Sequence, residues 1–445
     1  MNFDQALSYL LGLGHETLTI KLGLQNTETL LAALGNPQRN YQSVQIAGTN
    51  GKGSTAAFLD SICRAAGIRT GLFTSPHLLS ITERIKVDGQ PISETQFARL
   101  TGLVKAVADQ LIARGELPTA PTFFEHVTAI ALLAFAKARV ELAILETGLG
   151  GRLDSTTAAR ASVVALTPIA MDHEEYLGRT IELIASEKAA IIREGVTAIV
   201  GSEPDEALDV ILKRCQECRL DPVLASGECE IEAVENDGRL RVNLSTASDD
   251  YHHVLLRLRG RYQIDNAMIA VASAEALRER GFEIMRDAIV SGLERATHPG
   301  RLEWWPGQCA ILFDGAHNPA AAQALRDYLD EFVSQPIIMI FGAMRDKRLD
   351  EMAEVLFSKA HQLILTKIDN PRAASLEELE LVAQLYVYAT RVHQASSPAE
   401  ALRLARELTS AEDLIVVTGS LYLVGEVQKI LESQMPAIAS REVGN

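Results

Sequence analysis

Short apolar runs alternate with helix-forming stretches along almost the whole 445-residue chain. The run at 43–48 (SVQIAG) precedes an amphipathic stretch at 54–67, and a second run follows at 70–75. Two further runs with the composition of buried strands lie at 140–148 and 161–170. Alternation of this kind is typical of a parallel sheet whose two faces are covered by helices, so the pattern predicts an α/β fold.

A second series of the same kind occupies the C-terminal third of the chain. Its apolar runs and the helical stretches after them lie at 309–329, 336–344, 361–369 and 413–427. The segment 296–308 (ATHPGRLEWWPGQ) separates the two series and contains two prolines and two glycines, which favour a linker. A chain of this length exceeds what one hydrophobic core usually holds, so we expect two domains, 1–296 and 297–445.

The segment at 228–246 departs from this alternation. Its residues alternate between apolar and polar around an Asn-Asp-Gly turn, a pattern that predicts a β-hairpin. The stretch 266–281 then returns to a helical pattern and ends at Gly281, which suits the position after a helix. A β-hairpin therefore interrupts the first series.

The charge of the chain excludes some classes of ligand. It carries 42 basic and 58 acidic residues, a formal net charge of −16. A field of that sign repels nucleic acid, and no basic stripe offsets it, so nucleic-acid binding is disfavoured. The same field repels a polyanionic small molecule. Such a ligand must therefore meet concentrated local positive charge from lysine, arginine, a metal ion or a helix N-terminus.

The cysteines and the apolar runs indicate a protein of the cytoplasm. Five scattered cysteines do not form a disulfide framework, and we expect the C-x-x-C pair Cys215 and Cys218 to be incidental thiols on a helix rather than a zinc site. The first residues lack the basic region of a secretory signal, and the longest apolar run, 127–136, is about half of a bilayer span. We therefore expect a soluble cytoplasmic protein without a membrane partner.

A glycine-rich segment, AGTNGKGST, joins the first apolar run to the helical stretch after it. Gly48 precedes Gly51 by three positions and Gly53 separates Lys52 from Ser54, so the spacing differs from that of the common P-loop. A strand, a glycine-rich turn and a helix aim backbone N–H groups and the positive helix end at one point, which suits a phosphate. Lys52 adds a full positive charge there. The alternative is a turn closed by Ser54 as helix N-cap, but three glycines and a lysine in six positions favour nucleotide binding.

Acidic residues and a histidine follow two of the predicted strands. Glu146 closes the run at 140–148, and Asp172 and His173 follow the run at 161–170. Ligand sites in α/β proteins gather at the carboxyl ends of strands, and oxygen ligands suit the Mg²⁺ of a nucleotide. Taken singly, each residue is more often a cap or a hydrogen-bonded loop residue. Together with the glycine-rich loop they predict a site.

Ten short motifs in a fixed order relate the chain to a known family: AGTNGKGST, TSPHL, ERIKVDGQPI, ETGLGGRLD, MDHEEYLG, EKAAIIREG, NAMIA, PGRLE, DGAHNP and TGSLY. They resemble those of folylpolyglutamate synthase in the Mur ligase superfamily and span residues 48–422. The resemblance implies a Mur-ligase-like P-loop ATPase domain with a mostly parallel sheet and a smaller Rossmann-like C-terminal α/β domain. It also explains the loop spacing, because the Mur-type loop is the compact G-T-N-G-K-G-S form.

The chemistry that the resemblance implies is ATP-dependent amide ligation. A substrate carboxylate takes the γ-phosphoryl group of ATP, and the amine of L-glutamate attacks the resulting acyl phosphate. This route divides one difficult condensation into two easier steps, because phosphate is a better leaving group than oxide. The implied ligands are ATP, Mg²⁺, L-glutamate and a reduced folate, with dihydropteroate left open as a second acceptor. We expect the enzyme to act as a monomer.

The resemblance also assigns roles to residues at matching positions. The nucleotide would contact Thr49, Asn50, Gly51, Lys52, Gly53, Ser54, Asn266, Arg301 and Asp314. The expected Mg²⁺ ligands are Ser75, Glu146 and His173, and the expected catalytic residues are Lys52, Lys188 and His317. Lys188 matches a lysine that the family carbamylates with CO₂, whereas an unmodified Lys188 would be a charge on a helix surface. Because Arg301 and Asp314 come from the linker and the second domain, the nucleotide would lie between the domains.

A second set of positions matches the folate and glutamate sites of the family. These are Thr122, Phe123, Phe124, Glu125, Leu153, Asp154 and Ser155 for the folate, and Ser420 with His317 for the incoming glutamate. Aromatic rings suit a flat pterin, and a carboxylate can accept hydrogen bonds from its amino groups. The alternative for Phe123 and Phe124 is that both are core residues at the start of a helix.

Two positions depart from the family pattern. Lys21, in TIKL, stands where bifunctional members often have an acid, which weakens the case for dihydropteroate as a substrate. Ala190, in EKAAIIR, replaces a glycine, a change that a helix tolerates. Two other functions stay open: a Mur-type ligase for another acidic substrate, and a P-loop protein that binds nucleotide as a switch without ligation.

Overall fold

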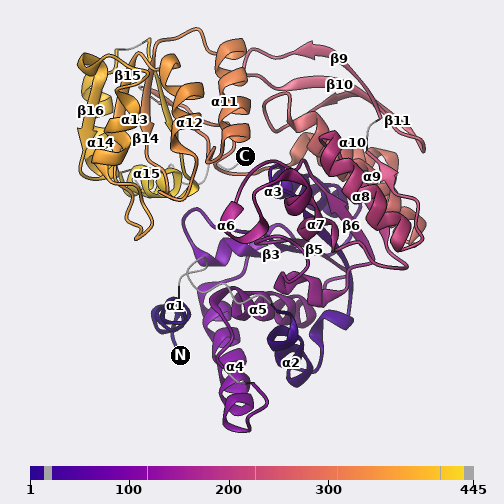
Figure 1. The fold of residues 1–445 in the computed structure, drawn as a ribbon. Coiled ribbons are helices and arrows are strands. Elements are labelled where there is room, and N and C mark those ends of the chain that lie inside the picture. The colour runs from indigo at the N-terminus through magenta and orange to yellow at the C-terminus, as the bar shows by residue number, and fades with distance from the viewer. Residues whose placement is uncertain (15–22, 118, 226, 308, 411, 435–445) are drawn as a thin grey trace.

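The computed structural model describes residues 1–14, 23–117, 119–225, 227–307, 309–410 and 412–434. Lys21, at which the sequence departs from bifunctional members of the family, lies outside the described residues. The described part forms two parallel sheets with helices on both faces and a third, antiparallel sheet (Figure 1). The predicted α/β fold is confirmed.

The larger sheet has eight strands in the order β4-β3-β2-β5-β1-β6-β7-β8. They are β1 (Gln42–Ala47), β2 (Thr70–Phe73), β3 (Ile85–Val87), β4 (Gln90–Pro91), β5 (Leu142–Glu146), β6 (Val163–Leu166), β7 (Thr197–Val200) and β8 (Val223–Leu224). The six strands from β2 to β8 in this order run parallel to one another. At the edge, β3 pairs antiparallel with β2, and β4 pairs antiparallel with β3. Because β1 lies between β5 and β6, the loops that follow these three strands meet at one edge of the sheet.

Alternate residues of each strand bury themselves on opposite faces of this sheet. Val44 and Ile46 of β1 join one core with α3 (Lys52–Ala65), α9 (Gln263–Glu279) and α10 (Arg286–Arg295). Leu145 of β5 points to the other face, which is covered by α1 (Phe3–Gly12), α2 (Gln25–Ala33), α4 (Glu94–Ala113) and α5 (Phe123–Ala138). The same face under β6 and β7 is covered by α7 (Ile181–Ala189) and α8 (Asp205–Glu217), which follow the short α6 (Glu174–Leu177). The sheet is therefore buried on both faces, as its continuous apolar runs predict.

The helix after the glycine-rich loop begins earlier than the sequence indicates. α3 starts at Lys52 with Gly51 as its N-cap residue, not near Ser54. Gly51 adopts a φ of 89°, which glycine allows without strain, so the chain enters the helix directly from the loop. Ser54 is consequently the third residue of the helix and not its cap.

The predicted hairpin is present as part of a three-stranded sheet in the order β11-β10-β9. Its strands are β9 (Glu228–Val234), β10 (Leu240–Ser245) and β11 (Asp250–Leu255). The turn between β9 and β10 reaches the second parallel sheet, because Tyr328 Oη of α11 (Pro319–Phe332) donates to Asp237 O over 2.8 Å. Gly238 has a φ of 77°, and a Cβ there would lie 2.3 Å from the Tyr328 ring. The hairpin tip thus packs directly on α11.

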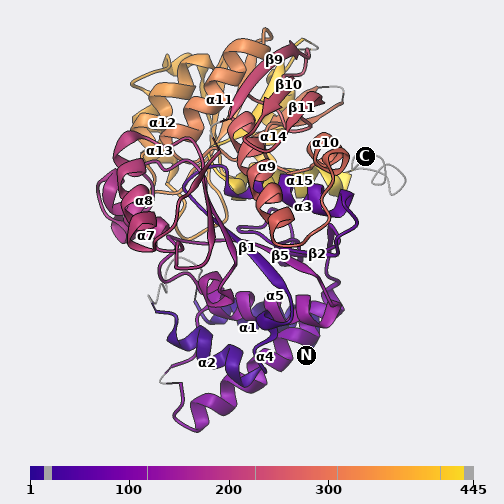
Figure 2. The same cartoon turned by 90° about the vertical axis from the view of Figure 1, so that its right-hand side faces the viewer.

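The smaller parallel sheet has six strands in the order β12-β13-β17-β14-β15-β16, with only β12 antiparallel. They are β12 (Glu303–Trp305), β13 (Ala310–Phe313), β14 (Ile337–Phe341), β15 (Gln362–Thr366), β16 (Val392–Ala395) and β17 (Leu414–Thr418). One face packs against α11, α12 (Leu349–Leu356) and α13 (Leu376–Ala383), and the other against α14 (Pro398–Leu408) and α15 (Leu421–Gln434). In Figures 1 and 2 this sheet and its helices lie at the end of the molecule opposite α2 and α4.

The two parallel sheets share no strand. The proline-rich segment follows α10 and contains β12, which pairs with β13 of the smaller sheet. The division at residue 297 stays a prediction. No helix in the described ranges is both long enough and apolar enough to cross a membrane.

Candidate active site

A cavity of about 490 Å³ lies between the carboxyl edges of the two parallel sheets. From the larger sheet it is lined by the loops that follow β1, β5 and β6, and from the smaller sheet by the loops that follow β13, β14 and β17. Every site residue named from the sequence lines this cavity except Phe123. Residues from 48 to 422 therefore meet in one place, although their individual roles stay predictions.

The glycines of the loop after β1 are required by close packing. A Cβ on Gly48 would lie 1.9 Å from Thr167 Oγ1, one on Gly51 would lie 2.2 Å from Asn266 Oδ1, and one on Gly53 would lie 2.7 Å from His298 Nε2. A side chain at Gly51 or Gly53 would have to displace Asn266 or His298, and one at Gly48 would also meet the Thr167 carbonyl at 2.5 Å. The compact spacing of this loop therefore reflects a loop pressed between β6, α9 and the proline-rich segment.

The amide groups of the loop divide into two sets. Thr49 N and Asn50 N donate to Pro168 O over 3.1 and 3.2 Å, so these two amides hold the loop in place. The first helical hydrogen bond runs from Thr55 N to Gly51 O. The amides of the three intervening residues precede that bond, and amides in the first turn of a helix are the ones that bind an anion. Thr49 and Asn50, both expected at the nucleotide, therefore have backbone amides that donate to Pro168.

Two buried lysines converge on the loop. Lys52 Nζ donates to Gly48 O over 3.1 Å and to Thr49 O over 2.9 Å, and Lys188 Nζ donates to Gly48 O over 2.6 Å. Burial lowers the pKa of both amines, that of Lys188 to about 7, and the two cations further disfavour each other. Lys188 is 4% exposed, so its interpretation as a surface charge is wrong. Near pH 7 a substantial fraction of Lys188 is a neutral amine.

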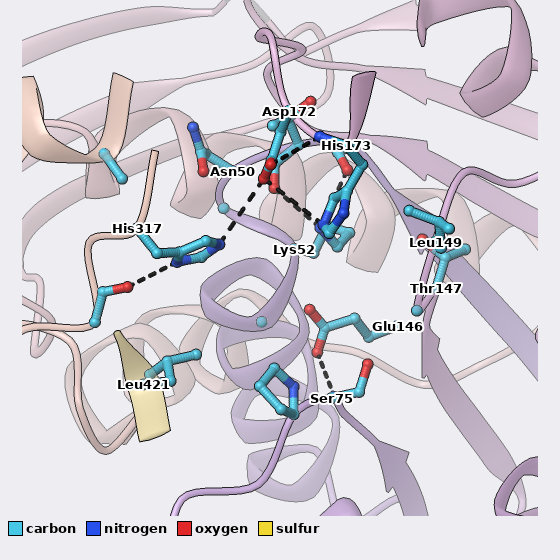
Figure 3. Close-up of a pocket in the computed structure, with 18 of the residues that line it drawn as sticks. Asn50, Lys52, Ser75, Glu146, Thr147, Leu149, Asp172, His173, His317 and Leu421 are labelled. Atoms are coloured by element: carbon cyan, nitrogen blue, oxygen red, sulfur yellow. Dashed lines mark hydrogen bonds and ion pairs between the residues drawn. The ribbon is translucent and has the colours of Figure 1, made fainter. Parts of the chain in front are cut away.

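Glu146 closes β5 beside the loop, and its Oε2 accepts a hydrogen bond from Ser75 N over 3.1 Å (Figure 3). Burial raises the pKa of this carboxyl, while Lys52 lowers it. The loop that carries Ser75 also touches the second sheet's helices, because a Cβ on Gly425 of α15 would lie 2.2 Å from Leu78 O. Glu146 is therefore anchored to a loop that both parts of the molecule position.

Asp172 and His173 follow β6 and face the same cavity. His173 adopts a φ of 51° at the start of α6, and its Nε2 lies 3.8 Å from Asp172 Oδ2. Burial lowers the pKa of His173 to about 3, so the imidazole is neutral and able to act as a ligand at pH 7. Burial alone would raise the pKa of Asp172, but His173, Lys347 and His317 hold it well below its ordinary value.

The predicted metal ligands supply only part of the coordination that Mg²⁺ requires. Glu146 offers a carboxylate, Ser75 a hydroxyl and His173 a neutral imidazole, and hard cations of this kind usually keep waters and phosphate oxygens as further ligands. In the ranges that the structure describes, three or more His, Cys, Asp or Glu side chains do not gather closely enough to hold an ion by themselves. The set therefore fits a cation that arrives with a nucleotide.

The smaller sheet contributes the other side of the cavity. Asp314, after β13, accepts from Leu302 N over 3.0 Å and from Ala316 N over 2.9 Å, and burial raises its pKa although Arg301 lowers it. His317 Nδ1 lies 2.8 Å from Gly315 O, and burial lowers the pKa of His317 to about 4. These contacts orient the side chains toward the larger sheet, and Figure 3 shows His317 facing Asp172.

Two residues of this side were not predicted from the sequence. Lys347, in the loop after β14, lies 2.6 Å from Asp172 Oδ1, and both side chains are 8% exposed. Asn318 exchanges hydrogen bonds with Asn50 over 2.9 and 3.3 Å. Lys347 follows the carboxyl end of a predicted strand, so the rule that singled out Glu146 and Asp172 could have found it.

The remaining part of the cavity lies at the start of α5. Thr122 caps this helix, and Glu125 Oε2 accepts from Thr122 N over 2.6 Å. Glu125 Oε1 is buried and has no hydrogen-bond partner among the described residues. The Phe124 ring lines the cavity against Gly148, where a Cβ would lie 2.5 Å from it. Phe123, in contrast, is 4% exposed, packs in a hydrophobic core and does not line the cavity, which favours the core alternative for this residue.

Asp154 and its neighbours shape the loop after β5. Asp154 accepts from Gly148 N over 2.8 Å, from Leu149 N over 3.0 Å and from Thr156 N over 3.0 Å. Its carboxylate therefore bonds to backbone amides and to the Thr156 hydroxyl, and it fixes the shape of this loop.

Comparisons with known proteins agree with this geometry. The model of the Mur ligase middle domain matches residues 46–274, and that of the Mur ligase glutamate ligase domain matches residues 300–421. A dihydrofolate synthase/folylpolyglutamate synthase of Bacillus subtilis is 32% identical over 424 residues, with 93% of this chain and 96% of the relative covered. A probable bifunctional folylpolyglutamate synthase/dihydropteroate synthase of Halobacterium salinarum is 36% identical over 437 residues, which cover 96% of this chain but only 51% of that relative.

A solved structure is similar over nearly the whole chain. Mycobacterium tuberculosis folylpolyglutamate synthase complexed with ADP superimposes with a TM-score of 0.90 at 32% identity, and covers 96% of this chain and 98% of that one. The chain belongs to the Mur ligase family and, within it, to the folylpolyglutamate and dihydrofolate synthases.

Proposed function

We propose that this protein is an ATP-dependent ligase that joins L-glutamate to a reduced folate through an acyl phosphate. The observation that carries the proposal is the single cavity that has a nucleotide-type loop at one end, an aromatic side chain with a buried carboxylate at the other, and loops of a glutamate ligase domain along its side. The relatives bear the names of enzymes with this activity, and one is a complex with ADP.

In the first step a folate carboxylate oxygen attacks the γ-phosphorus of ATP, and ADP leaves. The free amides of the first turn of α3 and Lys52 would hold the phosphates and offset the negative charge that develops on them. Ser75, Glu146 and His173 would hold Mg²⁺ beside the phosphates, and the ion would supply further charge neutralisation. Phe124 and Glu125 would orient the pterin.

In the second step the amine of L-glutamate attacks the carbonyl carbon of the acyl phosphate, the amine loses a proton, and phosphate leaves. His317 and Ser420, from the smaller sheet, would contact the incoming glutamate. The cavity is formed by both sheets, so the acyl phosphate would be shielded from water that could hydrolyse it.

We also propose that Lys188 is carbamylated. The reaction requires a neutral amine, and the pKa of about 7 supplies one at physiological pH. Addition of CO₂ would replace a cation by an anion beside Lys52, which would relieve the repulsion between the two lysines. Carbon-13 NMR of the protein in ¹³CO₂-saturated buffer should show one carbamate signal that a Lys188→Arg variant lacks.

The proposed activity is tested with purified protein, ATP and labelled L-glutamate, with tetrahydrofolate in one reaction and dihydropteroate in another. Label should enter the folate product in the first. Incorporation in the second as well would add the dihydrofolate synthase activity named for the Bacillus relative. Absence of incorporation from both would contradict the proposal. The cytoplasmic location and the monomeric state expected from the sequence stay predictions.

A further inference from the structure

Asp172 lies where the two parallel sheets meet. Its Oδ1 accepts from His173 N over 2.8 Å within its own loop and from Lys347 Nζ over 2.6 Å across the interface. Its Oδ2 accepts from Asn318 Nδ2 over 3.3 Å and lies 3.9 Å from His317 Nε2. One carboxylate therefore receives three side chains from the smaller sheet.

Asn318 connects this carboxylate to the nucleotide loop. Its amide donates to Asn50 Oδ1 over 2.9 Å, and its own Oδ1 accepts from Ala321 N over 2.9 Å as the N-cap of α11. The start of α11, the glycine-rich loop and Asp172 thus share one set of hydrogen bonds. Movement of the smaller sheet away from the larger one would break the bonds from Asn318 to Asn50 and to Asp172 together.

The pair formed by Asp172 and Lys347 differs from a second ion pair across the same interface. Arg348 Nε lies 2.6 Å from Glu174 Oε1, the same distance, but these side chains are 40% and 28% exposed rather than 8% and 8%. A buried charge whose partner is removed is strongly destabilised, whereas an exposed pair contributes little. The neighbouring residues 347 and 348 therefore provide a buried pair and an exposed pair for direct comparison.

We propose that Asp172 and Lys347 are positioning residues that align His317 and Asn318 of the smaller sheet with the nucleotide loop. Ligation then proceeds only when the two sheets are correctly placed relative to each other. This inference rests on the proposed ligase function. Asp172 acts here as an anion that binds the opposite sheet, and not as a metal ligand. The effect should appear in the rate of the chemical step more than in nucleotide binding, because the loop and α3 that would hold the phosphates follow β1 of the larger sheet. Arg301 and Asp314, which are expected to reach the nucleotide from the linker and the second domain, are not among the residues changed.

A double-mutant cycle tests the proposal in the full-length protein. Asp172→Asn and Lys347→Gln should each lower kcat by about 100-fold, since small misplacements of reacting groups have effects of that size. The double variant should be no slower than the slower single variant, because each change already breaks the same contact. Affinity for ADP, measured by calorimetry, should stay within about threefold of the wild type in all three proteins. Lys347→Arg, which keeps the charge, should recover part of kcat.

Glu174→Gln and Arg348→Gln form the matched control cycle and should change kcat by no more than about twofold. Multiplicative effects of Asp172→Asn and Lys347→Gln on kcat would overturn the proposal, as would equal losses in the control cycle. A tenfold higher Mg²⁺ requirement in Asp172→Asn alone would overturn it in favour of metal binding. Thermal unfolding identifies a variant that fails to fold, and Lys347→Gln then carries the test. If the wild type binds ADP but forms no product, the ligase proposal fails. X-ray scattering of the same variants would then still test whether Asp172 and Lys347 hold the two sheets together, because their loss should give a more extended molecule.

Discussion

The two ends of the cavity differ in how their side chains are held. We name them after their proposed occupants: the phosphate end around the glycine-rich loop and the folate end at the start of α5. At the phosphate end the Lys52 and Lys188 amines are fixed by backbone carbonyl groups, and Glu146 is fixed by a backbone amide. At the folate end the Phe124 ring rests against Gly148, and one oxygen of Glu125 has no hydrogen-bond partner among the described residues. The phosphate end is therefore organised by the protein itself, whereas the folate end offers an acceptor that the amino group of a pterin would satisfy.

This difference predicts where substitutions act. Changes at the phosphate end should lower the rate of the chemical step, because preorganised charge acts on the transition state. Changes at the folate end should weaken the binding of one substrate and leave the rate at saturation nearly intact. Substitutions at the two ends therefore distinguish effects on the rate from effects on substrate binding.

Lys52→Ala should have the largest effect, a loss of about 1000-fold in kcat, because it removes the charge that would stabilise the transferring phosphoryl group in the proposed mechanism. Steady-state phosphate release under saturating substrates measures it. Lys213→Ala, at an exposed position on α8, is the control and should retain full activity. A Lys52→Ala enzyme within a few fold of the wild type would remove this lysine from the proposed mechanism.

Lys188→Met should lower kcat by about 100-fold and should also change how stability depends on pH. The pKa of Lys188 is about 7 in the folded protein and 10.5 ordinarily, so between these values the unfolded chain binds the extra proton. Unfolding free energy of the wild type therefore rises with pH in this window through Lys188. Below pH 7 the wild type carries the unfavourable buried charge in full.

Relative to the wild type, Lys188→Met should be most stable at pH 6.5 and should lose that advantage by pH 10. Urea unfolding at pH 6.5, 8 and 10 measures the difference. A difference that does not depend on pH would mean that Lys188 keeps its ordinary pKa, and would remove the basis for its carbamylation.

Phe124→Leu and Phe123→Leu compare two adjacent aromatic residues at the folate end. Phe124→Leu should raise the KM for folate by about tenfold and leave the KM for ATP unchanged, because the ring would stack on the pterin. Phe123→Leu should leave both KM values unchanged and lower the free energy of unfolding by about 1 kcal/mol. Equal effects of the two substitutions on the folate KM would contradict the distinction between cavity and core.

The same two ends show how far the sequence predicts the molecule. Strands, helices and the glycine-rich loop follow from local patterns, and the carboxyl ends of strands located Glu146, Asp172 and His173. The sequence could not tell which of Phe123 and Phe124 faces the cavity. Adjacent residues of a helix point in different directions, and the packing of the Phe124 ring against Gly148 is set by the tertiary fold.

Residues whose partners lie far away in the chain were harder to predict. Lys347 and Asn318 acquire their contacts only when the second sheet meets the first, and the burial of Lys188 depends on the loop that covers it. The amide of Thr49 faces Pro168 for a similar reason, because the loop after β6 supplies the acceptor. Local sequence patterns predict which edge of a sheet carries the site, and tertiary packing decides which atoms point into it.

The most direct test of the ligase function is the substrate dependence of phosphate release. With purified protein, ATP and Mg²⁺, phosphate should appear at a sustained rate only when tetrahydrofolate and L-glutamate are both present, in equal amount to the glutamate incorporated. Sustained release that is indifferent to both substrates would contradict the ligase function and would identify a nucleotide-binding switch or an ATPase instead.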